Sequence, residues 1–105
     1  GWGVPTFDAF YSLQSLVRSP GAGGDGNFNL GRFSDPQMDA LIERIKKETD
    51  ATTRNQLIEQ ALIKEHELVS HIPLYNQVIP WAGSKKVEII HRADNRIDWR
   101  YLKVN

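Results

Sequence analysis

The sequence contains no cysteine, which excludes disulfide bonds and thiolate metal sites. It also has no excess of either charge, since 13 Lys and Arg residues balance 13 Asp and Glu residues. Proteins that bind nucleic acid or anionic membranes usually carry a basic excess, so this balance argues against both kinds of partner. No apolar run approaches the roughly 18 residues that span a bilayer. We therefore expect no membrane insertion by this chain.

Complete catalytic and metal-binding motifs are also missing. His66, His71 and His91 are scattered along the chain, and no His-Glu-x-x-His spacing occurs. No serine stands in a G-x-S-x-G nucleophile motif. Asp39 and Glu43 are four residues apart on a predicted helix, where a solvated pair is commoner than an acid/base pair. The sequence therefore predicts no enzymatic activity, no metal and no cofactor.

Two glycine-rich stretches match ligand-binding motifs only in part. Residues 21–26, GAGGDG, match G-x-G-x-x-G, but a dinucleotide site requires a strand before the motif, and here a helical pattern precedes it. Residues 25–36 begin like a calcium loop. However, Leu30 takes the place of the required glycine and Pro36 that of the bidentate glutamate. We interpret this region as a flexible loop.

Three segments repeat apolar residues at helical spacing. The first covers residues 6–19 and stops at Pro20-Gly21. The second starts with Asp35 as N-cap and Pro36 at the first helical position. The third is capped by Thr49-Asp50, and the short connection predicts an antiparallel helical hairpin. The apolar positions of these three patterns are Phe10, Leu13, Leu16 and Val17, then Met38, Leu41, Ile42 and Ile45, then Leu57, Ile58, Ala61, Leu62, Leu68 and Val69.

From Ile72 onward the pattern becomes extended, because Pro73 prevents the third helix from continuing. The stretches IPLYNQVIPWAG, KVEIIH and IDWRYLKV are interpreted as strands, with an Asp94-Asn95 turn between the last two. With helices first and strands last, the sequence predicts an α+β fold. Among the aromatic residues, Trp2 is a candidate ligand contact because the glycines on either side of it cannot shield it.

Several stretches, in this order, resemble the C-terminal part of family 5 solute-binding proteins, the peptide-, nickel- and oligosaccharide-binding receptors of bacterial ABC importers. The resemblance covers essentially the whole chain. It is carried by GWGVPTFDAFYSL, a glycine-rich loop, NLGRFSDPQMDALI, ETDATTRNQLIEQA and IPLYNQVIPWA. The most specific pieces are Asn29–Ile42, Thr49–Arg54 and Ile72–Tyr75.

This resemblance implies an α+β fragment of a two-lobe α/β periplasmic binding protein (type II) fold, with a helical hairpin followed by C-terminal strands. Residues 1–76 would belong to the second, C-terminal lobe. Residues 77–105 would form the hinge crossing and the C-terminal strands of the first lobe. IPLYNQVIPWAG would then be the chain's return crossing between the lobes. On this interpretation, the rest of the same receptor chain is a partner of the segment.

The implied function is that of the substrate-binding component of a bacterial ABC importer, periplasmic or lipid-anchored outside the cytoplasmic membrane. It would capture a peptide or another small solute between two lobes and deliver it to the permease subunits. The implied ligand-binding residues are Trp2, Gly3, Val4, Asn29 and Arg32. For Asn29 a turn former is the alternative, and for Arg32 an ion pair with Asp35 or Asp39.

The aspartate that peptide receptors of this family often carry after the tryptophan is absent here. Its absence argues against an ordinary dipeptide with a free amino group and leaves a modified peptide, an opine-like compound or another small solute open as the ligand. Asp8 is the nearest carboxylate, but its place at the start of a helical pattern makes it a better N-cap than a ligand group.

A second hypothesis belongs to another class: a small α+β protein-interaction domain that docks a partner through its helical hairpin. An enzyme fragment is a third. The receptor interpretation is favoured because a self-sufficient adaptor has no use for a long apolar crossing strand followed by a lone hairpin.

Overall fold

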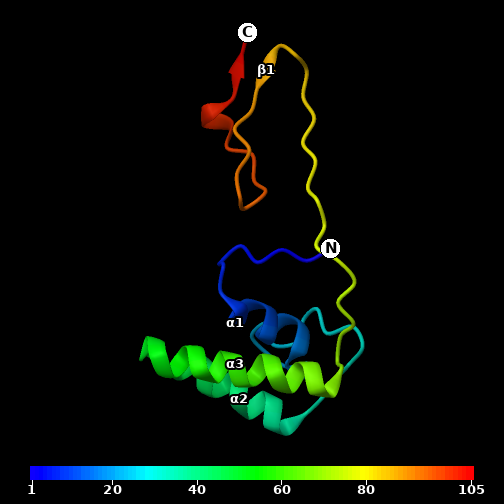
Figure 1. Cartoon of the computed structure of the whole chain (residues 1–105), viewed down its shortest axis with the longest axis vertical. Helices are drawn as coiled ribbons and strands as arrows, with labels where there is room; N and C mark the ends of the chain where they lie inside the picture. The colour runs from blue at the N-terminus through cyan, green and yellow to red at the C-terminus, as the bar shows by residue number, and fades with distance from the viewer. The chain divides into compact units, whose positions relative to one another are not determined.

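The computed structural model describes residues 1–105, which form two compact units (Figure 1). Thr6–Pro73 make up a helical unit, and Gly1–Pro5 join Leu74–Asn105 in a second unit. The helices of the chain are too short or too polar to cross a membrane. The assignment of residues 1–76 and 77–105 to two lobes of a larger receptor stays a prediction.

The helical unit begins with α1 (Ala9–Ser12), which Asp8 caps by accepting a 2.9 Å hydrogen bond from the backbone N–H of Phe10. The predicted single helix over residues 6–19 is wrong in length and in pitch. After α1 the backbone widens into a π-helical turn, η1 (Leu13–Val17), closed by a 2.9 Å bond from the N–H of Arg18 to the carbonyl of Leu13.

The glycine-rich loop accounts for the end of this helix. The N–H groups of Gly26 and Phe28 donate to the carbonyls of Gln14 and Ser15 at 2.8 and 3.0 Å. The last turn of a helix leaves such carbonyls without intrahelical partners, and here the loop supplies the donors. Residues far along the chain therefore set where the helix stops, and the local apolar pattern does not contain this information.

The predicted helical hairpin is confirmed. α2 (Pro36–Lys47) and α3 (Ala51–Leu68) run antiparallel and pack against each other (Figure 1). The side chains of Asp35 and Asp50 accept hydrogen bonds from the N–H groups of Met38 and Thr53, at 2.6 and 2.8 Å, so both predicted N-caps are present. α3 ends at Leu68, and its C-cap Val69 has a left-handed φ of 49°.

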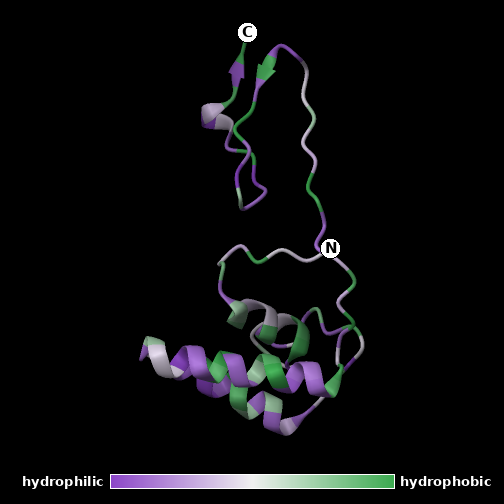
Figure 2. Cartoon of the chain, in the orientation of Figure 1, coloured by the Kyte–Doolittle hydropathy of each residue, from purple (hydrophilic) through white to green (hydrophobic).

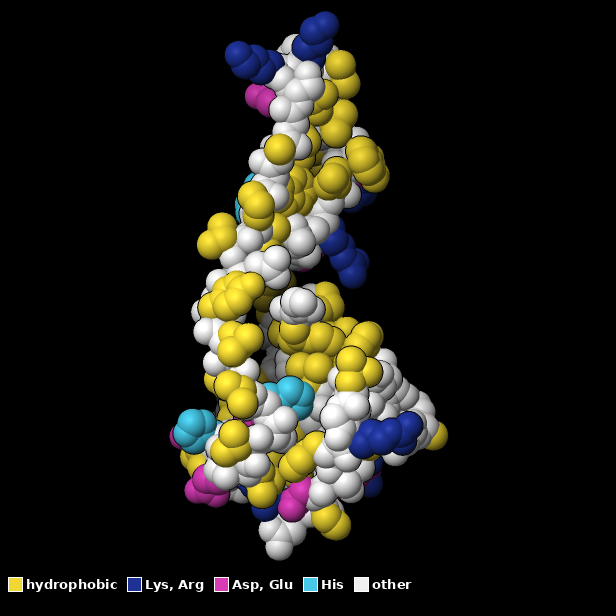
Figure 3. All heavy atoms as spheres, turned by 90° about the vertical axis from the view of Figure 1, so that its right-hand side faces the viewer, with side chains coloured by type: hydrophobic (Ala, Val, Ile, Leu, Met, Phe, Trp, Pro, Cys, Tyr) yellow, Lys and Arg dark blue, Asp and Glu magenta, His cyan; other side chains and the backbone are white.

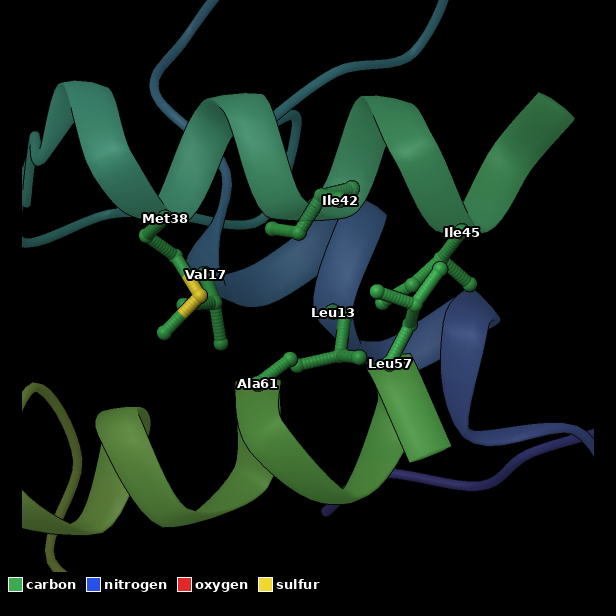
Figure 4. Packing of buried hydrophobic residues seen from close by; sticks show 7 residues of the cluster. All are labelled: Leu13, Val17, Met38, Ile42, Ile45, Leu57 and Ala61. Carbon is green, nitrogen blue, oxygen red and sulfur yellow. The ribbon is translucent and has the colours of Figure 1, made fainter. Parts of the chain in front are cut away.

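Side chains from η1, α2 and α3 form the core of the helical unit (Figure 4). Met38, Ile42 and Ile45 line one face of α2 and are fully buried, as their spacing predicts. Leu41 packs against this cluster and is partly buried. The remaining members of the core are Leu13, Val17, Leu57 and Ala61. Burial of these chains supplies the main stabilisation of the hairpin.

The predicted buried face of α3 is wrong at three of its positions. Leu62, Leu68 and Val69 are 47%, 39% and 62% exposed. Figure 2 shows apolar and polar residues mixed along α3, and its apolar residues are not confined to the buried Leu57 and Ala61. One neighbouring helix can cover only one face, which leaves these three side chains at the surface.

In the second unit the predicted strands are mostly absent. Residues 72–86 contain no strand. Two-residue strands, β1 (Val87–Glu88) and β2 (Lys103–Val104), pair antiparallel with Val87 opposite Val104. A strand needs hydrogen-bond partners for its backbone groups, and an isolated two-stranded sheet is only marginally stable in water. The predicted Asp94-Asn95 turn is confirmed, because the N–H of Asn95 donates to the carbonyl of Arg92 at 3.0 Å.

A short 3₁₀ turn, η2 (Trp99–Tyr101), precedes β2 and replaces the predicted strand there. Many large apolar side chains lie at the molecular surface (yellow in Figure 3). Those of the segment after α3 are Ile72, Leu74, Tyr75, Val78 and Ile79. All are exposed, Leu74 by 83% and Val78 by 82%.

Candidate ligand-binding site

The loop between η1 and α2 carries two of the predicted ligand-binding residues, and a polar network holds it in place. Arg18 pairs through Nε with Asp25 Oδ2 in the loop at 3.1 Å, and through Nη1 with Glu43 Oε2 on α2 at 2.9 Å. Gln14 Nε2 donates to the other oxygen of Asp25 at 2.9 Å. These side chains are partly shielded from water, which strengthens the contacts relative to fully exposed pairs.

Glu43 is the most strongly perturbed acid of the helical unit. Hydrogen bonds from Arg18, and then from Lys47 one helical turn away, lower the pKa of Glu43 to about 2. The Lys47 Nζ lies 3.1 Å from Glu43 Oε1. Both contacts favour the ionised carboxylate. At neutral pH Glu43 is therefore charged and holds Arg18, which in turn pairs with Asp25 in the loop.

Asn29 lies inside the loop and is only 5% exposed. Its Nδ2 donates to the carbonyls of Arg18 and Phe33, at 3.0 and 2.8 Å. Its Oδ1 accepts from the N–H of Phe33 at 3.0 Å. The two donors of the amide are thus used within the loop. The structure places Asn29 as a turn-forming residue that ties the start of the loop to its end.

Arg32 lies three residues further on, and its side chain is exposed. Its backbone has a φ of 53°, in the left-handed region that residues with a Cβ seldom adopt. The pairing predicted as an alternative, with Asp35 or Asp39, does not form. Asp35 lies 3.6 Å from Lys64 Nζ, and Asp39 accepts a hydrogen bond from the N–H of Ser19 at 2.9 Å.

The other three predicted ligand-binding residues belong to the second unit. Trp2 is 38% exposed, Gly3 is exposed and Val4 is half-buried. No heavy atom lies within 4 Å of the position that a Cβ on Gly3 would take, so the space beside it is open. These residues therefore lie in a different unit from Asn29 and Arg32, and their ligand contacts stay a prediction.

Asp8 is an N-cap, as its position at the start of the helical pattern predicts. Besides capping α1, its Oδ2 pairs with Arg54 Nη1 on α3 at 2.9 Å. The hydrogen bond from Arg54 lowers the pKa of Asp8. The guanidinium of Arg54 also lies over the ring of Phe10, 5.9 Å from its centroid. Through these contacts Asp8 stabilises the fold and serves as a cap, and both of its carboxylate oxygens have partners within the helical unit.

The glycine-rich region that carries the two partly matching motifs contains no helix or strand. Residues 23–28 are a succession of turns, which confirms the loop interpretation of GAGGDG. In addition, no group of three or more His, Cys, Asp or Glu side chains lies close enough together to hold a metal ion.

Sequence reasoning missed a charged cluster in the second unit. Arg92 forms two hydrogen bonds with Asp94, and Arg100 forms two with Asp98. The hydrogen bonds from Arg92 lower the pKa of Asp94 to about 2, and those from Arg100 lower the pKa of Asp98 to about 2. The cluster borders an open depression of about 330 Å³. Each pair stands two residues apart in the sequence, which is the signal that would have revealed it. Because these charges neutralise one another, we assign the cluster a structural role.

An apolar groove of about 300 Å³ lies nearby in the same unit, lined by Trp81, Ala82, Ile89, Asn95 and Ile97. Trp81 Nε1 donates to Asn95 Oδ1 at 2.8 Å, and the rings of Trp81 and His91 meet edge to face with centroids 5.0 Å apart. This groove was not predictable from the sequence, since its lining comes from separate stretches without a common motif.

Comparison with known proteins gives one informative match. Over 76 residues the chain is 33% identical to the "Probable deoxycholate-binding periplasmic protein YgiS" of Escherichia coli (strain K12). The match covers 72% of this chain and 13% of that protein, so the chain spans a small part of its relative. No protein-family model and no solved structure matches. The chain is therefore similar to a segment of a periplasmic binding protein.

Proposed function

We propose that this chain is part of the substrate-binding component of a bacterial ABC importer of the family 5 type, which captures a small solute without catalysis. The observation that carries the proposal is the 33% identity to a periplasmic binding protein over 76 residues. In such a receptor the solute is enclosed between two lobes and passed to permease subunits outside the cytoplasm.

The exposed apolar surface supports the idea that the chain is completed by further protein. Ile72, Leu74 and Val78 are 75%, 83% and 82% exposed and lie in one continuous segment. Residues 72–83 also form no backbone–backbone hydrogen bond. Proteins seldom leave so much contiguous apolar surface in water, and an extended segment with free backbone groups is suited to join a sheet. We propose that the remainder of a two-lobe receptor supplies that sheet.

For the ligand we propose an amphipathic organic anion of the kind that the relative's name indicates, deoxycholate. A peptide remains the second candidate. The proposed ligand contacts are Trp2, Gly3, Val4 and Arg32. An aromatic ring suits an apolar body, and a guanidinium suits a carboxylate. Asn29 is left out of this set because its two amide donors are engaged inside the loop.

The test is a calorimetric titration of the complete protein encoded by the gene with deoxycholate, beside the same titration of the 105-residue chain. We expect saturable binding by the complete protein and none by the chain alone, because most of the enclosing surface lies in the other lobe. Mass spectrometry of the released deoxycholate should show an unchanged molecule. Equal binding by the chain alone would contradict the two-lobe site.

The protein-interaction alternative has one observation in its favour. Leu62 and Ile63 on α3 are 47% and 54% exposed, which offers a partner an apolar strip on the hairpin. In that case the complete protein would not bind deoxycholate. Substitution of Leu62 and Ile63 by serine would then abolish capture of a protein partner and leave the free protein folded.

A further inference from the structure

We propose that Arg32 binds the anionic group of the solute and that Asn29 is its positioning residue. The inference rests on the proposed function, in which this chain is part of a solute receptor. The family resemblance implies that both residues contact the ligand. Here Arg32 alone contacts it, and Asn29 acts only by holding Arg32 in position.

Asn29 is unsuited to contact a ligand. Its side chain is 5% exposed, and its amide forms hydrogen bonds with the backbone of Arg18 and Phe33. A ligand would have to break these bonds, and a buried amide group left without partners is costly. Asn29 therefore serves the loop itself.

The loop that Asn29 closes holds Arg32 in a specific backbone conformation. Both the N–H and the carbonyl of Phe33, the next residue, are bonded to the Asn29 side chain. The N–H of Arg32 donates to the carbonyl of Asn29 at 3.1 Å. Between these anchors Arg32 has a φ of 53°. Residues with side chains persist in this region only where the surrounding structure fixes them, and such strain is common at ligand sites.

The charge of Arg32 is available to a ligand. Its guanidinium is exposed and forms no ion pair, although Asp35 and Asp39 lie close in the sequence. Asp35 is occupied by the N–H of Met38 and by Lys64, and Asp39 by the N–H of Ser19. A guanidinium without a carboxylate partner, on a backbone that Asn29 holds in place, is suited to bind a carboxylate in two parallel hydrogen bonds.

The experiment compares deoxycholate with its neutral methyl ester as ligands of the complete protein. We expect the native protein to prefer the acid by about tenfold or more, because a charge-assisted bond is lost with the ester. Arg32→Ala should remove this preference. Arg44→Ala should preserve it, since Arg44 is an exposed arginine on α2 that also lacks an ion pair.

Three further variants separate positioning from stability. In a double-mutant cycle, Asn29→Ala should weaken binding of the acid in the native background but add no loss to Arg32→Ala. Should Asn29→Ala not fold, Asn29→Asp makes the same test, because it keeps the acceptor but removes both donors. Arg32→Gly should lose the preference for the acid with an unfolding midpoint at or above that of the native protein, since glycine adopts a positive φ freely.

The outcomes distinguish this inference from the proposed function. A native protein that binds neither compound would contradict the proposed ligand, and the inference with it. A native protein that binds both equally, or an Arg32→Ala variant that still prefers the acid, would overturn the role of Arg32 alone. Additive losses in the cycle would show that Asn29 is a purely structural residue.

Discussion

Arg18 and Glu43 are 25 positions apart in the sequence, yet Arg18 Nη1 lies 2.9 Å from Glu43 Oε2. The contact joins the end of η1 to the middle of α2, and Arg18 also holds the loop through Asp25. The arrangement that presents Arg32 thus depends on a charged pair in another part of the helical unit.

The helical unit should lose stability in acid through Glu43. The pKa of this carboxyl is lowered from 4.5 to about 2 in the folded chain, mainly by its bond to Arg18. A group whose pKa is lower when folded stabilises the fold above its unfolded pKa. That contribution is lost as the pH falls from about 4.5 to about 2.

We therefore expect Glu43→Gln to reduce the drop in thermal midpoint over this range, measured by helical circular dichroism. The pKa values of Asp8 and Asp50 are also lowered, so these two residues should still make the thermal midpoint of the variant depend on pH. Glu59→Gln is the control, because Glu59 is an exposed carboxylate without an ion pair. An unchanged acid profile in Glu43→Gln would mean that the pair contributes nothing.

Gly26 should be the least replaceable glycine of the loop. It is buried with a φ of 58°, and a Cβ there would overlap the carbonyl of Arg18 and come within 2.8 Å of the nitrogen of Pro20. Gly23 has a similar φ of 69° with open space around it. In urea denaturation, Gly26→Ala should therefore cost about 1 kcal/mol or more beyond the cost of Gly23→Ala. Equal losses would show that the loop yields at this point.

Asp35 should stabilise α2 as an N-cap more than as a charge. Asp35→Ala removes the acceptor for the N–H of Met38 and should lower the free energy of unfolding by about 0.5–2 kcal/mol. Asp35→Asn keeps the acceptor and loses only the charge, with its attraction to Lys64 at 3.6 Å and to the helix N-terminus, so it should cost less than about 1 kcal/mol. If the two variants are equally unstable, the charge and not the cap is the stabilising part.

The parts of the fold that sequence predicts well are those set by neighbouring residues. Asp35 with Pro36 starts α2, Asp50 starts α3, and Pro73 prevents its extension. The pitch of η1 was not predictable, because the carbonyl of Gln14 accepts a hydrogen bond from the N–H of Gly26, 12 residues further along the chain. Likewise, the sequence could not decide whether Asn29 contacts a ligand or forms a turn. That choice depends on whether the carbonyl of Arg18 lies within hydrogen-bond distance of its side chain, as it does in the structure.

The strands were predicted from composition, but a strand also requires a partner. IPLYNQVIPWAG is rich in apolar and aromatic residues, and it forms no strand because no neighbouring strand pairs with it. The same reasoning applies to the outer face of α3, where apolar side chains lack a covering layer.

Leu62 provides a mutational test of that missing layer. In the 105-residue chain it is 47% exposed, so Leu62→Ala should change stability by less than about 1 kcal/mol. If the rest of the receptor covers α3, the same substitution in the complete protein should cost about 2–3 kcal/mol. Ile42→Ala, at a fully buried position, should cost about 2–5 kcal/mol in both proteins and serves as the reference. The comparison is made by urea denaturation.

The most direct test of the central claim, that this chain completes a two-lobe receptor, is amide hydrogen exchange of the segment Leu74–Ile79. This segment forms no backbone–backbone hydrogen bond in the chain. If the segment pairs with a sheet of the receptor, we expect rapid exchange in the 105-residue chain and strong protection in the complete protein. Equally rapid exchange in both proteins would contradict it.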